Sequence, residues 1–279
     1  TDGNELIRRR VPTRRDSYEE VVHTVADLVR SVERELGTEA TVGAGTPGAL
    51  SPASGLIKNA NLTVLNGRPL DRDLSTALDR EVRIANDADC LALSEATDGA
   101  GAGHGTVFAV ILGTGTGGGV TVNRSIVTGP NAIGGEWGHN PLPWPTADEL
   151  IGPDCYCGQR GCLETYLSGP GMADDHERVT AMRMSPPEIV AAARDGEPGA
   201  EATLERYADR LARGLASIIN VLDPHVIVLA GGLSQVPELY ERVPMVWGTY
   251  VFSDQVDTPL VPAVHGDSSG VRGAAWLWG

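Results

Sequence analysis

The sequence contains little cysteine, and most of it is gathered in one place. Only four of the 279 residues are cysteine, and Cys155, Cys157 and Cys162 fall within the segment CYCGQRGC. So few cysteines in a chain of this length do not form the dense disulfide framework of small secreted domains. We therefore expect a cytoplasmic protein, in which three neighbouring thiols need another explanation.

Basic residues and long apolar runs are also scarce. Lys and Arg number 22 against 37 Asp and Glu, which gives a net charge of −15. This balance argues against DNA, RNA and anionic membrane surfaces, because all of these attract basic patches. The chain has no apolar run of the ~18 residues that a membrane span requires, and no recognisable signal peptide. We expect neither nucleic acid nor membrane as a partner.

Strand and helix patterns alternate along the first hundred residues. Residues 17–36 carry apolar side chains at helical spacing, Ser17 and Glu20 form a predicted capping box, and Gly37 ends the helix. Further strands and helices then alternate as far as about residue 104, as in a sheet covered by helices.

A glycine-rich segment separates this part from a second alternating part. Residues 99–105, GAGAGHG, predict a hinge or linker. The second part ends in a predicted helix at 268–278. We therefore predict an α/β protein with two lobes and a cleft between them. The first lobe is residues 1–104 and the second is residues 105–279, with the last helix packing back on the first lobe.

The chain begins with an isolated turn signal. Asp2-Gly3 is typical of a hairpin turn, and residues 4–11 after it have the composition of a strand. A hairpin needs a strand on each side of its turn, and only Thr1 precedes this one. We infer that the first strand of the first lobe lies upstream of this sequence.

The cysteine cluster has the composition of a metal site. Cys155, Cys157 and Cys162 offer three soft thiolates in one tight loop. A structural zinc ion takes four ligands, commonly cysteine with histidine. Cys90 or a histidine could supply the fourth, and His139 lies nearby in the sequence. A redox pair or plain buried thiols are the alternatives, and the compact spacing favours zinc.

Two glycine-rich turns follow buried strands. Residues 112–119, LGTGTGGG, expose backbone N–H groups that can cradle a phosphate, although they match neither the Walker nor the dinucleotide pattern. Residues 229–234, LAGGLS, would let a flat ligand such as adenine approach the backbone closely. For both segments, an ordinary turn between two elements is the alternative.

Polar side chains accompany these turns. Asn86 and Asp87 end a predicted strand, where ligands bind in open α/β sheets. Asp87 could act as a general base, or it could cap the following helix. Glu136, His139 and Glu164 flank the cysteine cluster. Carboxylates and an imidazole suit sugar hydroxyls, which both donate and accept hydrogen bonds. For the two glutamates, surface charge is the alternative.

Taken together, these motifs resemble the ROK family (repressors, open reading frames and kinases), over essentially the whole chain. Within that family they look most like the bacterial fructokinases. The segments that carry the resemblance are TPGALSPASGLIKNANLTVLNGRPLDRDL, NDADC, EWGHNPLPW, CYCGQRGCLET, LDPHVIVLAGGLS and GDSSGVRGAAWLW, with the glycine loop leading to GGEWGH. The resemblance implies a two-lobed, actin-like ATPase fold of the ribonuclease H-like type. It also implies transfer of a phosphoryl group from ATP, with Mg²⁺, to a hexose hydroxyl.

The resemblance also implies roles for individual residues. Asp87 matches the catalytic base. The sugar-binding positions are Asn86, Asp87, Glu136, His139 and Glu164. The positions around ATP are Gly115, Thr116 and Gly117 at the phosphates and Gly231 and Gly232 at the adenosine. The ligands of a structural zinc ion are His139, Cys155, Cys157 and Cys162. This zinc would orient Glu136, His139 and Glu164 towards the sugar and leave the second ring nitrogen of His139 free to meet a hydroxyl.

The preferred sugar and the assembly are further expectations. The segment KNANLTVLNGRPL favours fructose, while mannose, glucose and N-acetylglucosamine are alternatives, as is a non-catalytic sugar sensor or repressor. The family implies a homodimer. The sequence departs from the family pattern at two places. An N-terminal Asp-x-Gly-Gly-Thr-type loop, which contacts phosphate and metal, is absent from it, and Asp89 stands where the family usually has Asn, beside the predicted base.

Overall fold

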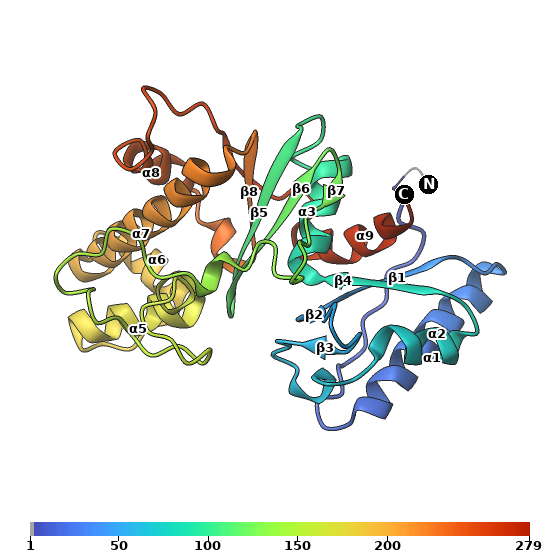
Figure 1. Cartoon of the computed structure of the whole chain (residues 1–279). Helices are drawn as coiled ribbons and strands as arrows, with labels where there is room; N and C mark the ends of the chain where they lie inside the picture. Colours follow the sequence, from blue (N-terminus) through green and yellow to red (C-terminus); the bar gives the residue numbers. More distant parts are fainter. Residues whose placement is uncertain (1–2) are drawn as a thin grey trace.

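The computed structural model describes residues 3–279, apart from the side chain of residue 267. Its elements form two groups, with helices α3 and α9 between them (Figure 1). The predicted turn begins at Asp2, which lies outside the described residues. Residues 4–11, expected as a strand, pair with none of the described strands, so that expectation is wrong. An extended segment becomes a strand only where a neighbour completes its hydrogen bonds.

A parallel pair of strands organises the first group. The elements of this group are α1 (Tyr18–Leu36), β1 (Val42–Thr46), β2 (Ala49–Leu50), β3 (Ile57–Lys58), η1 (Thr63–Leu65), α2 (Leu70–Leu78) and β4 (Val82–Asn86). β1 and β4 run parallel, and Thr46 pairs with Asn86, so both strands end at the same edge. Helix α1 begins and ends where the sequence predicts, because the Ser17 side chain accepts the Glu20 N–H and Gly37 adopts a left-handed conformation.

A five-stranded sheet organises the second group. The strands are β5 (Thr106–Leu112), β6 (Thr116–Val122), β7 (Ser125–Ile126), β8 (Val226–Ala230) and β9 (Leu260–Pro262). Their order is β7-β6-β5-β8-β9. β5 is antiparallel to β6 and parallel to β8. Every residue of β8 is buried, which explains its unbroken apolar sequence VIVLA. The glycine loop is the turn between β5 and β6.

Helices cover one face of this sheet, and α3 covers the other. Those on the first face are α4 (Glu164–Leu167), α5 (Gly169–Thr180), α6 (Pro186–Arg194), α7 (Pro198–Leu222) and α8 (Glu238–Trp247). The apolar spacing of residues 201–223 predicts a long helix, which corresponds to α7, and α7 buries much of its length. The sequence analysis did not predict α5, α6 and α8, which are short helices with little apolar periodicity.

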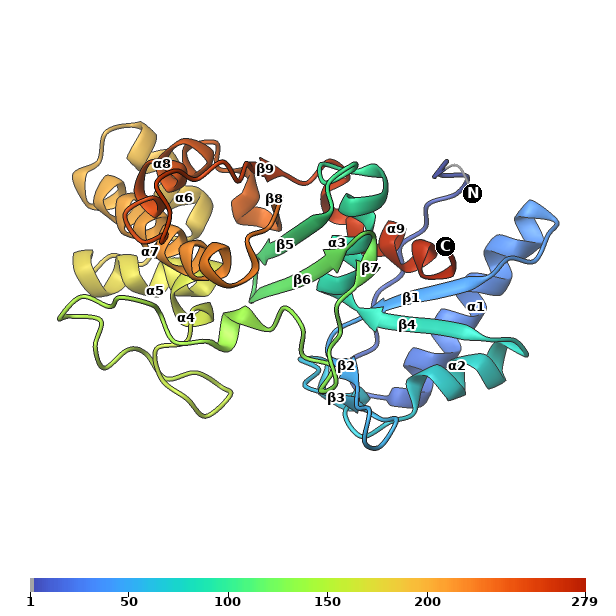
Figure 2. The same ribbon diagram turned by 45° about the horizontal axis from the view of Figure 1, so that its top comes forward.

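Two helices lie between the groups and pack through glycines. α3 (Asp87–Asp98) lies on β5 and β6, and α9 (Ser269–Ala275) lies beside β1 (Figure 2). A Cβ atom at Gly119 would come 2.3 Å from the carbonyl oxygen of Ala88, and one at Gly43 would come 1.8 Å from that of Ala274. Glycine is therefore required for this close packing. α3 precedes the predicted lobe boundary at residue 104, yet it packs on the sheet of the second group. A final short helix, η5 (Trp276–Trp278), follows α9.

The glycine-rich residues 99–105 form a packed turn. Gly101 N–H donates to Glu95 O, and His104 N–H donates to Gly101 O. A Cβ at Gly101 would come 2.7 Å from a methyl group of Val107. The expectation of a flexible linker here is therefore wrong, because the segment is hydrogen-bonded and Gly101 is closely packed, whereas a hinge at this turn stays a prediction. Among the described residues, no helix is both long enough and apolar enough to span a bilayer.

Candidate functional site

Strand β4 places Asn86 and Asp87 at the start of α3. The Asn86 side chain accepts the Ala88 N–H at 2.8 Å and donates to Gly48 O at 3.1 Å. Asn86 is therefore the N-cap of α3. Asp87 also accepts the Ala88 N–H, at 2.9 Å. The Asp87 side chain reaches the surface, yet the surrounding protein removes enough water to raise its pKa.

The glycine loop is joined to Glu164. The Thr116 N–H donates to Glu164 Oε2 at 2.9 Å. A Cβ atom at Gly115 would come 2.7 Å from the same carboxylate oxygen, so a glycine is needed there. The loop closes on itself through the Gly113 N–H, which donates to Gly115 O at 3.0 Å. The first residue of α4 therefore lies directly beside the turn that the sequence predicts to hold phosphates.

A short helix brings Glu136 and His139 to the same place. η2 (Trp137–His139) packs on β6, where the Trp137 indole N–H donates to Gly117 O at 3.0 Å. A Cβ at Gly138 would come 1.9 Å from the carbonyl oxygen of Thr116, so this approach also depends on glycine. Burial raises the pKa of Glu136, the nearby His139 lowers it, and the charges of Asp87 and Glu164 raise it. The other three ionisable residues that the sequence predicts at the sugar site thus all act electrostatically on Glu136.

The cysteine cluster and His139 form a compact set of ligand atoms. The Sγ atoms of Cys155, Cys157 and Cys162 and a ring nitrogen of His139 all lie within 4.8 Å of one another. The Nδ1 atom of His139 is 3.7 Å from Cys155 Sγ. Three thiols and an imidazole at this spacing fit a tetrahedral zinc ion. Cys90 is fully buried on α3, where its Sγ faces Gly45, and it belongs to no such cluster.

The second ring nitrogen of His139 is not free. Its Nε2 atom lies 3.1 Å from the hydroxyl of Tyr156, and the two rings meet edge to face. Tyr156 stands between two of the cysteines, and its residue is 78% exposed. The expectation of an unoccupied nitrogen is therefore wrong in this conformation, because a neighbouring hydroxyl of the chain already uses it. In the sequence, the position of Tyr156 between Cys155 and Cys157 is the feature that indicates this contact with His139.

Two cavities border the glycine loop. A cavity of about 590 Å³ has Gly115, Glu164 and Tyr156 in its wall. A second, of about 930 Å³, has Gly113 on one side and Gly232 on the other. Neither cavity includes Asn86, Asp87 or Glu136 in its wall.

The structure places Gly231 at a close approach of two strands. Gly231 has a positive φ of 86°, and a Cβ there would come 2.4 Å from Leu112 O. Gly232, by contrast, has open space around its Cα. The two glycines therefore differ: the first lets β8 end against β5, and the second leaves its backbone accessible from the larger cavity.

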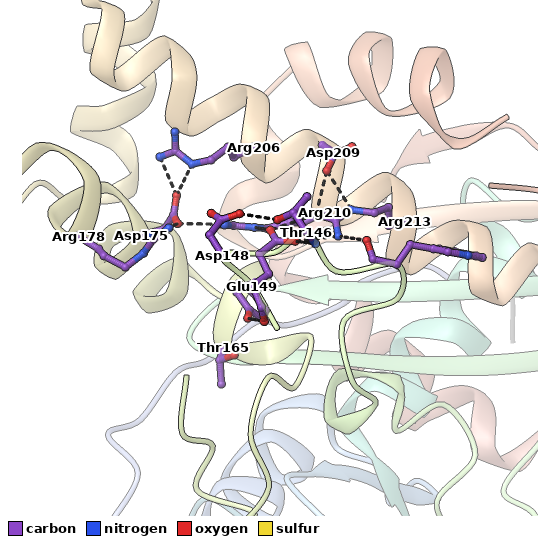
Figure 3. A network of polar contacts seen from close by, with 12 residues as sticks. Thr146, Asp148, Glu149, Thr165, Asp175, Arg178, Arg206, Asp209, Arg210 and Arg213 are labelled. Carbon is purple, nitrogen blue, oxygen red and sulfur yellow. Dashed lines mark hydrogen bonds and ion pairs between the residues drawn. The ribbon is translucent and has the colours of Figure 1, made fainter. Parts of the chain in front are cut away.

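A buried charge network supports this region, and the sequence analysis missed it. Arg210 and Arg213 of α7 reach Glu149 at 2.7 Å and 2.9 Å, and both arginines are only 2% exposed. Arg210 also contacts Asp175 of α5 at 3.0 Å. Figure 3 shows how these side chains converge from different segments. The Arg210 guanidinium lies over the ring of Tyr166, in the same short helix as Glu164.

Comparisons with known proteins show to which family this chain belongs. Residues 1–279 match the model of the ROK family. An N-acetyl-D-glucosamine kinase of Yersinia pseudotuberculosis is 40% identical over 274 residues, which cover 96% of this chain and 90% of that protein. An N-acetyl-D-glucosamine kinase of Escherichia coli is 41% identical over 282 residues, with the same coverage.

A solved structure is similar over almost the whole chain. The ROK hexokinase of Thermus thermophilus superimposes with a TM-score of 0.84 at 32% identity, covering 95% of this chain and 87% of that one. The expected α/β, actin-like ATPase fold is thereby confirmed. The match along the full chain, the relatives and the fold together show that this chain belongs to the ROK family.

Proposed function

We propose that this chain transfers a phosphoryl group from ATP to N-acetylglucosamine. That it is an ATP-dependent sugar kinase follows from its family and from its relatives. The choice of sugar is supported by relatives at 40–41% identity that are named N-acetyl-D-glucosamine kinases. The single structural observation that carries the proposal is the position of Glu136, whose carboxyl group is influenced by the charges of His139, Asp87 and Glu164, with Glu164 bonded to the glycine loop.

Asp87 is suited to the role of general base. Its carboxyl group is held at the start of α3 by the Ala88 N–H, and desolvation by the surrounding protein raises its pKa above the ordinary value of aspartate. A carboxylate with a raised pKa takes a proton more readily from a sugar hydroxyl. The hydroxyl oxygen then attacks the terminal phosphorus of ATP, the proton stays on Asp87, and ADP leaves. Asn86, Glu136, His139 and Glu164 would hold the other hydroxyls and orient the ring.

The second cavity would hold the nucleotide. The glycine loop that would meet the phosphates lines this cavity at Gly113 and Thr114, and Gly232 lines it on the part expected for adenosine. Gly115 lies in the wall of the first cavity, and the Thr116 N–H is held by Glu164. The cavity's volume of about 930 Å³ is in the range of small-molecule sites. ATP would bring Mg²⁺, which neutralises charge on the phosphates during transfer. The lining residues Gly113 and Gly232 then determine how closely the nucleotide approaches the backbone.

Zinc has a structural role in this proposal. The donor set of His139, Cys155, Cys157 and Cys162 would hold the ion and supply cross-linking rather than chemistry. His139 is both a ligand and the third residue of η2, which also positions Glu136. The ring of His139 is therefore fixed on one side by the cluster and on the other by Tyr156.

Other readings of the site give different experimental results. Fructose, which the sequence motifs favoured, stays a prediction, as do mannose and glucose. A non-catalytic sugar sensor would bind sugar without releasing ADP. ADP release with MgATP should be measured for fructose, mannose, glucose and N-acetylglucosamine. We expect the highest kcat/KM with N-acetylglucosamine. A higher value for any other sugar would overturn the choice of substrate, and no release with all four would overturn the kinase proposal.

A further inference from the structure

Asp89 is a buried carboxyl group for which the mechanism above has no role. It lies in the first turn of α3, two residues after Asp87, and is only 7% exposed. Its Oδ1 atom has no hydrogen-bond partner among the described residues. The charges that act on it come from Glu136, in the segment before η2, and from Asp87, on its own helix. Both of these charges are negative.

A carboxylate is unfavourable in such a position. Burial removes the water that would stabilise its charge, and two like charges nearby add repulsion. Among the described residues, no cationic side chain acts on Asp89 to compensate. The protonated, neutral form of Asp89 loses no hydration of a charge and is not repelled by Glu136 and Asp87. In agreement, burial and then the charges of Glu136 and Asp87 raise the pKa of Asp89 to about 7.

We propose that Asp89 is a positioning residue that works as a buried neutral acid, and that release of its proton to solvent impairs sugar phosphorylation. The inference rests on the proposed kinase activity. Ionised Asp89 would place a third negative charge beside the base and the sugar-binding Glu136. A negatively charged phosphoryl group must approach the same site, so each added negative charge opposes the reaction.

The expected signature is a pH profile. Wild-type kcat/KM for the sugar should fall as the pH rises above about 7, to about one thirtieth of its low-pH value by about pH 8.5 if the ionised form is inactive. Asp89→Asn has nearly the same shape and cannot ionise, so its kcat/KM should lose this decline. Asp254→Asn removes an exposed carboxyl group in the loop after α8 and serves as the control, which should keep the wild-type profile.

Thermal stability gives a second readout that needs no activity. The folded protein would hold a proton on Asp89 that the unfolded chain releases near the ordinary pKa of aspartate. This contribution to stability is therefore lost as the pH rises from about 4 to about 7. The Tm of Asp89→Asn should lack that part of the pH dependence. If Asp89→Asn does not fold, Asp89→Ser replaces it in both measurements.

The two readouts separate failure of this inference from failure of the proposed function. Equal pH profiles of kcat/KM for an active wild type and its Asp89 variant would overturn the inference while leaving the kinase intact. Equal Tm dependence on pH in the two proteins would overturn it as well. Absence of ADP release with every sugar would overturn the proposed kinase, and the Tm comparison would still decide whether Asp89 holds a proton.

Discussion

At the scale of single residues, the four cysteines show how the surroundings decide what one residue type can do. Cys155, Cys157 and Cys162 meet His139 in one cluster. Cys90 is fully buried on α3, and burial raises its thiol pKa to about 12. A thiol in such surroundings is inert. Only the clustered thiols are placed to share an ion.

Replacing one clustered cysteine should therefore release zinc. We expect purified Cys157→Ala to contain much less zinc than the wild type and to bind sugar more weakly, because His139 loses its anchor. Metal analysis of the purified protein measures the first effect, and sugar titration measures the second. Cys90→Ala is the matched control and should keep its zinc. Equal zinc content in Cys157→Ala and the wild type would show that the cluster holds no metal.

Gly115 is a second residue whose surroundings lead to a prediction. A Cβ there would press on the carboxylate of Glu164, which holds the Thr116 N–H. Gly115→Ala should therefore raise KM for ATP or lower kcat by about tenfold or more, since pushing Glu164 away from the Thr116 N–H would reshape the turn predicted to hold the phosphates. Kinetics with varied ATP would measure this. Gly248→Ala has open space for its methyl group, and should behave as the wild type. Unchanged kinetics in Gly115→Ala would show that the glycine loop is not part of the ATP site.

At the scale of elements, the charge network ties α7 to the segment that carries Glu164. The Glu149 carboxylate accepts hydrogen bonds from Arg210, Arg213 and the Thr146 N–H. Burial alone would raise the pKa of Glu149, but the hydrogen bonds from Arg213, Thr146 and Arg210 lower it to about 2. The resulting stabilisation is present above the ordinary pKa of glutamate. It is lost as the pH falls from about 4.5 towards about 2.

Removing this carboxylate should destabilise the protein strongly. Glu149→Gln removes the one carboxylate that both buried arginines share and leaves Arg210 with Asp175 and Arg213 with Asp209. Breaking a buried ion pair typically costs about 3–5 kcal/mol, and the remaining partners should hold the loss near the lower end of that range. Glu238→Gln is the control, because Glu238 pairs with Arg194 at a half-exposed position, where a salt bridge contributes about 1 kcal/mol or less. Denaturant unfolding at neutral pH compares the two variants. Equal losses of unfolding free energy in both variants would show that the buried network stabilises the protein no more than a surface ion pair does.

The same scale shows what sequence reasoning can and cannot reach. α1 and α7 have long apolar stripes and β8 has a continuous apolar run, so local patterns were enough to predict them. α5 and α6 are short, and their burial depends on contacts with α7 that no local pattern contains. The network escaped prediction for the same reason, since Glu149 and Arg210 are far apart in the sequence. The site residues were predicted through the family resemblance, because Asp87, Glu136 and Glu164 meet only in the fold.

At the scale of the whole molecule, few of the hydrogen bonds among the described residues join the first group of elements to the second group, which contains the glycine loop. Lys58 of β3 donates to Asn131 O at 2.5 Å across this boundary. The positive charge of Lys58 also lowers the pKa of Glu136. We propose that the groups on either side of α3 and α9 act as the two lobes. Closure of these lobes would then exclude water from Asp87 and limit wasteful hydrolysis of ATP.

The most direct test of the central claim compares the wild type with Asp87→Asn in two assays. Calorimetry measures N-acetylglucosamine binding, and a coupled assay measures ADP release with MgATP and the same sugar. Asp87→Asn should bind the sugar nearly as well as the wild type, while ADP release falls by about 10²–10⁴-fold, the usual contribution of a general base. Near-normal ADP release from Asp87→Asn would contradict the assignment of the base and, with it, the account of the site.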